Sequence, residues 1–205
     1  MVGRRHAAGI AAVALVAGLG LTGCGSVSNP GSAAKVGDET ISVSYLQKQS
    51  KDILAKAGRT DLGDAESTQL QGELLQQLID DQVIVVAGRR EGVTATQADV
   101  DKVRAEMTAQ QVVLPPDMVD GFARYVVIRR TLSTKLLGRA PASQQDQAKA
   151  DQLVGQRMTA AAKEIGVQVN PRYGTWSGTT LRPDGQLVKS TPSSAPAAVP
   201  APQAP

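Results

Sequence analysis

The chain has 205 residues, with 22 Lys and Arg against 19 Asp and Glu, which gives a formal net charge of +3 at pH 7. Two of the basic residues, Arg4 and Arg5, lie at the extreme N-terminus, so the charge of the rest is nearly balanced. This balance argues against a nucleic-acid-binding surface, which requires clustered basic charge.

The N-terminal segment has the parts of a bacterial lipoprotein signal peptide in the expected order. A cationic pair precedes residues 7–21, which are all apolar or glycine, and Leu21-Thr22-Gly23-Cys24 resembles a lipobox. The apolar stretch is shorter than the roughly 20 residues needed to span a bilayer as a helix. We expect cleavage between Gly23 and Cys24, S-diacylglyceryl and N-acyl modification of Cys24, and a lipid-anchored location on the extracytoplasmic face of the cell membrane.

Loss of the signal peptide, residues 1–23, would limit the chemistry of the mature chain. The only histidine, His6, lies in this segment, and the lipid would consume the only cysteine, Cys24. Without imidazole or thiol, the mature chain lacks the groups for Ser-His-Asp or Cys-His catalysis and the usual zinc ligands. We therefore expect no enzymatic activity, no catalytic residue, no metal site and no cofactor.

Residues 24–33 are rich in Gly and Ser and predict a flexible tether between the lipid and a folded domain over residues 34–188. The domain opens with the sequence AKVGDETI, in which Val36 and Ile41 flank the turn dipeptide Gly37-Asp38. This pattern predicts a short β-hairpin.

Two helices follow the hairpin. Ser44 and Gln47 have the spacing of a capping box, which predicts a first helix that ends near Gly58. The second is predicted from about Asp64 to Arg90, because Leu, Ile and Val recur there at i, i+4 spacing before a glycine.

The next two helices are separated by a proline pair. Thr96 predicts the start of a third helix that runs out near Pro115-Pro116, and Asp117 predicts the cap of a fourth that ends at Gly138. Each has apolar residues at helical spacing, so each is expected to bury one face.

A fifth helix is predicted from Ser143 to Gly166. Beyond it, Val167, Val169 and Trp176 lie in strand and turn composition, and we expect them to pair with the opening hairpin.

Residues 189–205 are rich in Ala and Pro, which predicts a disordered or extended tail. The predicted fold class is mainly α: a lobe of five helices, a small β hairpin or sheet formed by the N- and C-terminal ends of the domain, and the tail.

Two segments carry a family resemblance: AAKVGDETISVSYL and LLQQLIDDQVIVVAGRREGVTATQADVDKV. They resemble the N-terminal chaperone domain of the SurA, PrsA and PpiD family, over residues 34 to about 107. In that family a hairpin precedes a helix, a Leu-rich helix ends in Gly, and a Thr- or Ser-capped acidic helix follows, as at Gly92, Thr96 and Asp99. The resemblance implies a helical lobe that binds unfolded or secreted polypeptides.

The chain departs from the family in one respect. In the family, a parvulin prolyl isomerase domain commonly lies between the N-terminal helices and the returning segment, and its site usually includes histidines. Here only Ala140 to Ser143 separate the last two predicted helices. The resemblance therefore implies polypeptide binding without the isomerase domain.

Two other functions remain open at this point. One is a noncatalytic scaffold that binds a single cell-envelope partner, and the other is a peptidyl-prolyl isomerase. The partners we expect are polypeptide clients and the membrane, through the Cys24 lipid, and no nucleic acid; the oligomeric state is left open.

Flexible thioethers and aromatic rings suit surfaces that accept many apolar sequences. The candidate client-binding residues on this ground are Met107, Met118, Phe122, Tyr125 and Trp176, with core packing as the alternative. Asp80 and Asp81 are not a predicted catalytic pair, because adjacent helical positions diverge by about 100°. They predict a solvated helix face.

Overall fold

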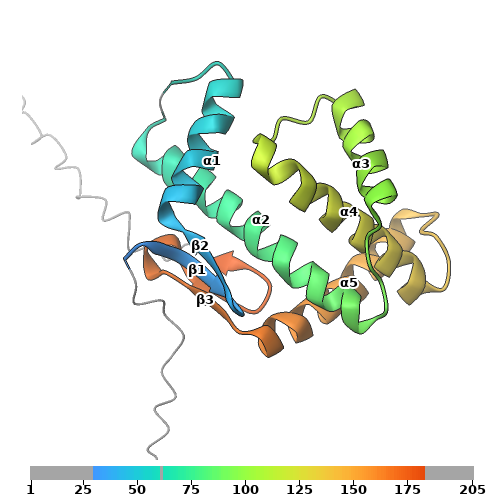
Figure 1. The fold of residues 1–205 in the computed structure, drawn as a ribbon. Coiled ribbons are helices and arrows are strands. Elements are labelled where there is room, and N and C mark those ends of the chain that lie inside the picture. The colour runs from blue at the N-terminus through green and yellow to red at the C-terminus, as the bar shows by residue number, and fades with distance from the viewer. Residues whose placement is uncertain (1–29, 61, 183–205) are drawn as a thin grey trace, which may run out of the picture.

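The computed structural model describes residues 30–60 and 62–182. Within these ranges the chain forms five α-helices, five short strands and one turn of 3-10 helix. The predicted fold class is confirmed: the lobe is mainly helical, and small antiparallel sheets lie at the two ends of the described chain (Figure 1).

The predicted hairpin consists of β1 (Ser32–Val36) and β2 (Glu39–Ser42), and Gly37 adopts a φ of 60° in the turn between them. β3 (Val167–Val169) pairs antiparallel with β1, so the strand order is β2-β1-β3. The predicted pairing of Val167 and Val169 with the opening hairpin is confirmed. The sheet joins the two ends of the described domain.

The predicted boundary between tether and domain is two residues late. Ser32 and Ala33 were expected in the tether of residues 24–33, but both belong to β1 and are buried. The Asn170 N–H donates to the Ala33 carbonyl at 2.9 Å, and its side-chain amide donates to the Ser32 carbonyl at 3.0 Å. These bonds to the C-terminal end of the domain explain why the strand begins earlier than the local composition suggests.

Helix α1 (Val43–Lys56) begins earlier than the predicted capping box. The N-cap is Ser42, whose hydroxyl accepts from the Tyr45 N–H at 3.1 Å, and Ser44 lies inside the helix. The prediction of Ser44 as the cap is wrong because Ser42, at the end of β2, already offers the hydroxyl that the first turn needs.

Helix α2 (Asp64–Arg90) has the predicted bounds and lies at the centre of the lobe (Figure 1). Helices α1, α4 and α5 pack against it, as do β1 and the 3-10 turn η1 (Pro171–Tyr173). Its fully buried side chains include Leu75, Ile79 and Ile84. The helix is covered from several directions along its C-terminal two thirds.

Helix α3 (Gln97–Ala109) starts after the predicted N-cap, Thr96, but ends well before the proline pair. Gln111 takes a φ of 56° just beyond it, so a loop rather than helix leads to Pro115. Helix α4 (Pro116–Leu137) starts at a proline, which is favourable in the first turn. The predicted cap at Asp117 is wrong, since no side chain caps α4.

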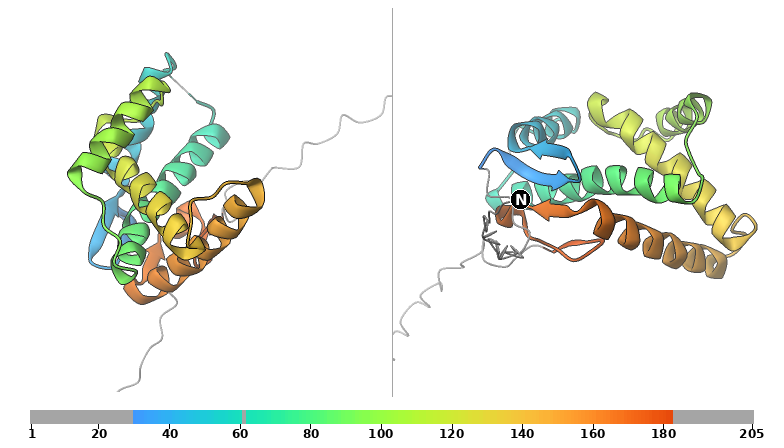
Figure 2. Two further views of the ribbon diagram at one scale, coloured as in Figure 1. Left: turned by 90° about the vertical axis from the view of Figure 1, so that its right-hand side faces the viewer. Right: turned by 60° about the horizontal axis from the view of Figure 1, so that its bottom comes forward.

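Helix α5 (Gln144–Ile165) is capped by Ser143 as predicted, and it packs along α4 and α2 (Figure 2). Trp176 does not pair with the opening hairpin, which corrects the prediction. It lies in β4 (Thr175–Trp176), which pairs with β5 (Leu181–Arg182) in a separate hairpin.

Several predictions concern residues outside the described ranges. These are the signal peptide with its cleavage site at Gly23 and Cys24, the larger part of the tether, and the tail of residues 189–205. Among the residues that are described, no helix is long and apolar enough to cross a membrane.

Gly88 lies on α2 where α4 packs on it, and a Cβ there would be 2.7 Å from Ile128 Cγ2 and 2.8 Å from the Val93 carbonyl oxygen. We expect Gly88→Ala to lower the free energy of unfolding by about 1–3 kcal/mol, because the close-packed helices would have to move apart. Gly155→Ala in α5 is the control, because a Cβ there meets nothing within 4 Å. The control should be neutral or stabilising by up to about 1 kcal/mol. Urea unfolding checks both variants, and equal stabilities would contradict this account of the α2–α4 contact.

Candidate functional site

A groove of about 900 Å³ runs along the N-terminal half of α2. Its lining positions on the helix recur every three or four residues from Asp64 to Asp80, as expected for one helical face. The facing wall comes from Tyr173 of η1 and from residues 179–181 at the start of β5. The groove therefore lies between the central helix and the returning C-terminal end of the domain.

Three of the groove-lining residues on α2 have small side chains. Ala65, Thr68 and Gly72 follow one another at near-helical spacing, and a Cβ at Gly72 would meet no atom within 4 Å. Because these residues leave the helix surface low, the space beside α2 stays unfilled. This series of small residues is the one signal for the groove in the sequence. The prediction of client-binding residues considered only Met and aromatic side chains and therefore missed it.

Gln76 joins the two walls. Its Nε2 donates to the Thr179 carbonyl at 3.1 Å, and its Oε1 accepts from the Leu181 N–H at 2.6 Å. One side-chain amide thus pairs with backbone groups two residues apart, as a neighbouring β-strand would. This end of the groove already holds an extended backbone segment of the same chain.

Tyr173 supplies a polar atom with no bonding partner at the groove wall. Its side chain is only 5% exposed, and among the described residues its hydroxyl has no hydrogen-bond partner. Burial of a polar group without a hydrogen bond costs free energy. The hydroxyl is therefore an unsatisfied donor behind the groove surface, and a ligand reaches it only when the groove wall shifts.

The groove is acidic. Asp64, Glu73 and Asp80 contribute carboxylates, and the described lining includes no Lys or Arg. Burial raises the pKa of Asp80 to about 6, although the hydrogen bond from Gln76 Nε2 at 2.9 Å and the charge of Arg129 act in the opposite direction. At neutral pH the groove favours cationic or neutral ligands over anionic ones.

Asp81 lies on the next position of α2, between Gln77 and α4. Gln77 Nε2 donates to its Oδ1 at 2.7 Å, and a Cβ at Gly121 would be 3.1 Å from its Oδ2. Burial raises the pKa of Asp81 to about 7, with a smaller contribution from the charge of Asp80. The prediction of a solvated face at Asp80 and Asp81 is therefore wrong, because α4 covers Asp81 and Asp80 is half-buried at the end of the groove.

Two of the predicted client-binding residues belong to the core. Met118 is 2% exposed in the main hydrophobic core, and Met107 is buried in a second cluster that joins α3 to α4. Neither side chain reaches the surface, so the core-packing alternative holds for both. The prediction that Met107 and Met118 contact a client is therefore wrong.

The other three predicted residues are partly buried. Phe122 and Tyr125 stack at a centroid distance of 6.2 Å on α4, and the Tyr125 hydroxyl accepts from Arg129 at 2.8 Å. Trp176 packs against the main core from β4. None of the three is among the described residues that line the groove, so their role in client binding stays a prediction at other surfaces.

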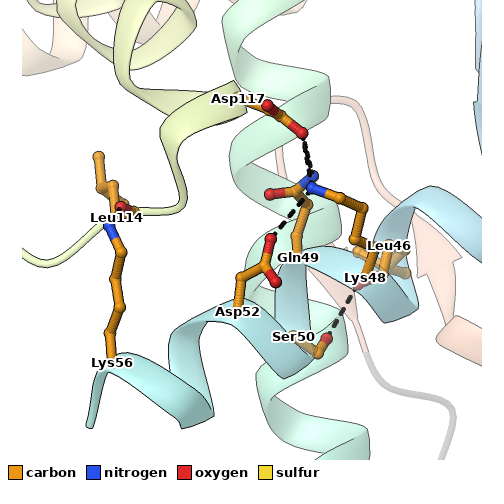
Figure 3. Close-up of polar contacts among 8 residues, drawn as sticks. All are labelled: Leu46, Lys48, Gln49, Ser50, Asp52, Lys56, Leu114 and Asp117. Atoms are coloured by element: carbon orange, nitrogen blue, oxygen red, sulfur yellow. Dashed lines mark hydrogen bonds and ion pairs between the residues drawn. The ribbon is translucent and has the colours of Figure 1, made fainter.

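Polar contacts join α1 to the start of α4 (Figure 3). Lys48 Nζ lies 3.1 Å from Asp52 Oδ2 and 2.8 Å from Asp117 Oδ2, and Gln49 Nε2 donates to the same Asp117 oxygen at 3.4 Å. The hydrogen bond from Lys48 lowers the pKa of Asp117. Asp117 therefore connects the two helices instead of capping its own.

The loop before α4 carries Val112 and Val113, the large hydrophobic side chains that are exposed in the described ranges. They follow the C-terminal end of α3 and are not among the groove-lining residues. Nowhere in residues 30–60 and 62–182 do three His, Cys, Asp or Glu side chains gather as a metal site would require.

A family model described as the SurA-like N-terminal domain matches residues 4–112, just over half of the chain. No curated protein and no solved structure matches the chain significantly.

The raised pKa of Asp81 predicts an unusual dependence of stability on pH. Between about pH 4 and 7 the folded state holds a proton that the unfolded state, with an ordinary carboxyl pKa, has released. The free energy of unfolding should therefore fall as pH rises through this window. Asp80 acts in the same direction up to about pH 6.

Asp81→Asn removes the charge and keeps an oxygen for Gln77. We expect it to raise the free energy of unfolding at pH 8 by roughly 2 kcal/mol and to flatten the pH dependence. Asp38→Asn, in the exposed turn of the hairpin, is the matched control and should change neither. Thermal unfolding at pH 5 and pH 8 provides the measurement. An unaltered pH dependence in Asp81→Asn would show that this carboxyl ionises freely in the fold.

Proposed function

The chain belongs to the SurA-like N-terminal domain family, and from this membership we propose that it is a membrane-anchored extracytoplasmic protein that binds unfolded or secreted polypeptides. We further propose that it acts without prolyl isomerase activity. The observation that carries the proposal is the groove along α2, with its low floor and its one-sided acidic charge.

The dimensions of the groove suit an extended chain. The helical face from Asp64 to Asp80 spans about 24 Å at 1.5 Å per residue. An extended peptide covers that length with about seven residues. The Gln76 amide is occupied by the backbone of residues 179–181, and it is an example within the chain of recognition through main-chain groups rather than through particular side chains. Recognition of this kind tolerates many client sequences.

The short connection between α4 and α5 supports the proposal that the protein acts without an isomerase domain at this place. Residues 138–143 are all that separate the two helices in the fold. A parvulin domain, at the place where the family commonly carries one, would need a far longer insertion. Binding by weak contacts would let clients leave without a nucleotide-driven step.

Filling the groove should weaken client binding. We expect Gly72→Gln to raise the dissociation constant for a permanently unfolded model client about tenfold, equivalent to about 1.4 kcal/mol. The reason is that the longer side chain occupies the open space above the floor. Gly155→Gln is the matched control, since it is also a helical glycine with open space but lies on α5, outside the groove.

Fluorescence anisotropy with a labelled client measures the affinities, and delayed aggregation of the same client measures the activity. Equal affinities of the two variants for the client would show that the client does not bind in the groove along α2. A single tight interaction with one envelope protein, together with no affinity for unfolded chains, would favour the scaffold function.

The membrane anchor is tested at Cys24, which lies outside the described residues. We expect Cys24→Ser to shift the protein from the membrane fraction to the soluble extracytoplasmic fraction, because the acyl chains supply the affinity for the bilayer. Fractionation of cells that express each form checks this. Retention in the membrane fraction of a Cys24→Ser chain from which the N-terminal segment has been removed would exclude a lipid on this residue as the anchor.

A further inference from the structure

The groove along α2 has a candidate occupant in the chain itself. Leu181 forms part of the groove wall, and β5 ends one residue later at Arg182. Residues 183–205 therefore begin at the rim of the groove. From this placement, and from the composition and hydrogen-bonding groups of the segment, we propose that the Pro-rich segment 192–205 docks in the groove of its own molecule.

The composition of this segment fits the floor of the groove. Its sequence, PSSAPAAVPAPQAP, combines five prolines with small side chains. Proline-rich sequences favour the extended polyproline II conformation, which loses little entropy on docking. Small side chains let the backbone of the segment come close to the low surface of Ala65, Thr68 and Gly72.

The hydrogen-bond chemistry is complementary as well. A polyproline II segment has backbone carbonyls without internal partners, and proline adds no N–H donor. The buried Tyr173 hydroxyl, which lacks a partner among the described residues, can donate to such a carbonyl once a shift of the groove wall exposes it. The segment also carries no acidic side chain that Asp64, Glu73 or Asp80 would repel.

The length of the connection permits docking within one molecule. The floor from Asp64 to Gln76 spans about 18 Å, which about six residues of polyproline II would cover. Residues 183–191 link the rim to the segment, and a random-coil linker of nine residues typically reaches about 16 Å. A link this short gives an effective concentration in the millimolar range, so modest intrinsic affinity is enough. Docking of the segment in cis does not require that any client binds.

Disulfide trapping in the full-length chain with Cys24→Ser tests the proposal. One protein carries Gln69→Cys in the groove and Ala198→Cys in the segment, and the control carries Gln71→Cys with the same Ala198→Cys. Gln71 is two residues further along the same helix and is not among the lining residues. Each rate of disulfide formation is divided by the rate at which the same helix cysteine reacts with a small disulfide reagent.

We expect the normalised rate of the 69–198 pair to exceed that of the 71–198 pair at least tenfold, at a protein concentration where the bond forms within one chain. Gly72→Gln added to the 69–198 protein should remove most of this difference. Equal rates for the two pairs, no effect of Gly72→Gln, or a bond that forms mainly between two chains would each overturn docking in cis. The assay contains no client, so its failure is distinguishable from a failure of client binding.

Discussion

The packing of α2 against the rest of the lobe is the interaction on which the structure depends. Buried side chains such as Leu75, Ile79 and Ile84 face α1, α4, α5 and the sheet, and apolar burial of this kind is the main favourable term in folding. Within the described residues, the N-terminal half of the same helix has one face that the other elements cover only in part, with Gly72 at its middle. The groove is therefore the incompletely covered part of the element that organises the core.

Part of this arrangement was predictable from the sequence because it depends on local chemistry. The bounds of α2 follow from its apolar spacing, and Thr96 and Ser143 cap their helices as their side chains predict. The early start of β1 and the separate β4–β5 hairpin depend on contacts between residues far apart in the chain. For the same reason Asp117 was misread, since its partner Lys48 lies on another helix.

The Met and aromatic side chains of the sequence do not indicate where the candidate site lies. Met107 and Met118 are flexible and apolar, but those properties serve the core equally well, and both are buried. The groove is instead formed by residues with small or polar side chains, such as Gly72, Gln76 and Tyr173. The family membership gives the proposal of polypeptide binding its class of ligand, while these residues give it a place in the fold.

Backbone amide NMR shifts, recorded as a permanently unfolded client is added to the full mature chain with Cys24→Ser, test most directly whether this place binds polypeptides. We predict that the largest changes fall on residues 64–80 of α2 and on residues 173 and 179–181. Changes centred instead on the exposed loop around Val112 and Val113, or a spectrum that the client leaves unaltered, would contradict the account.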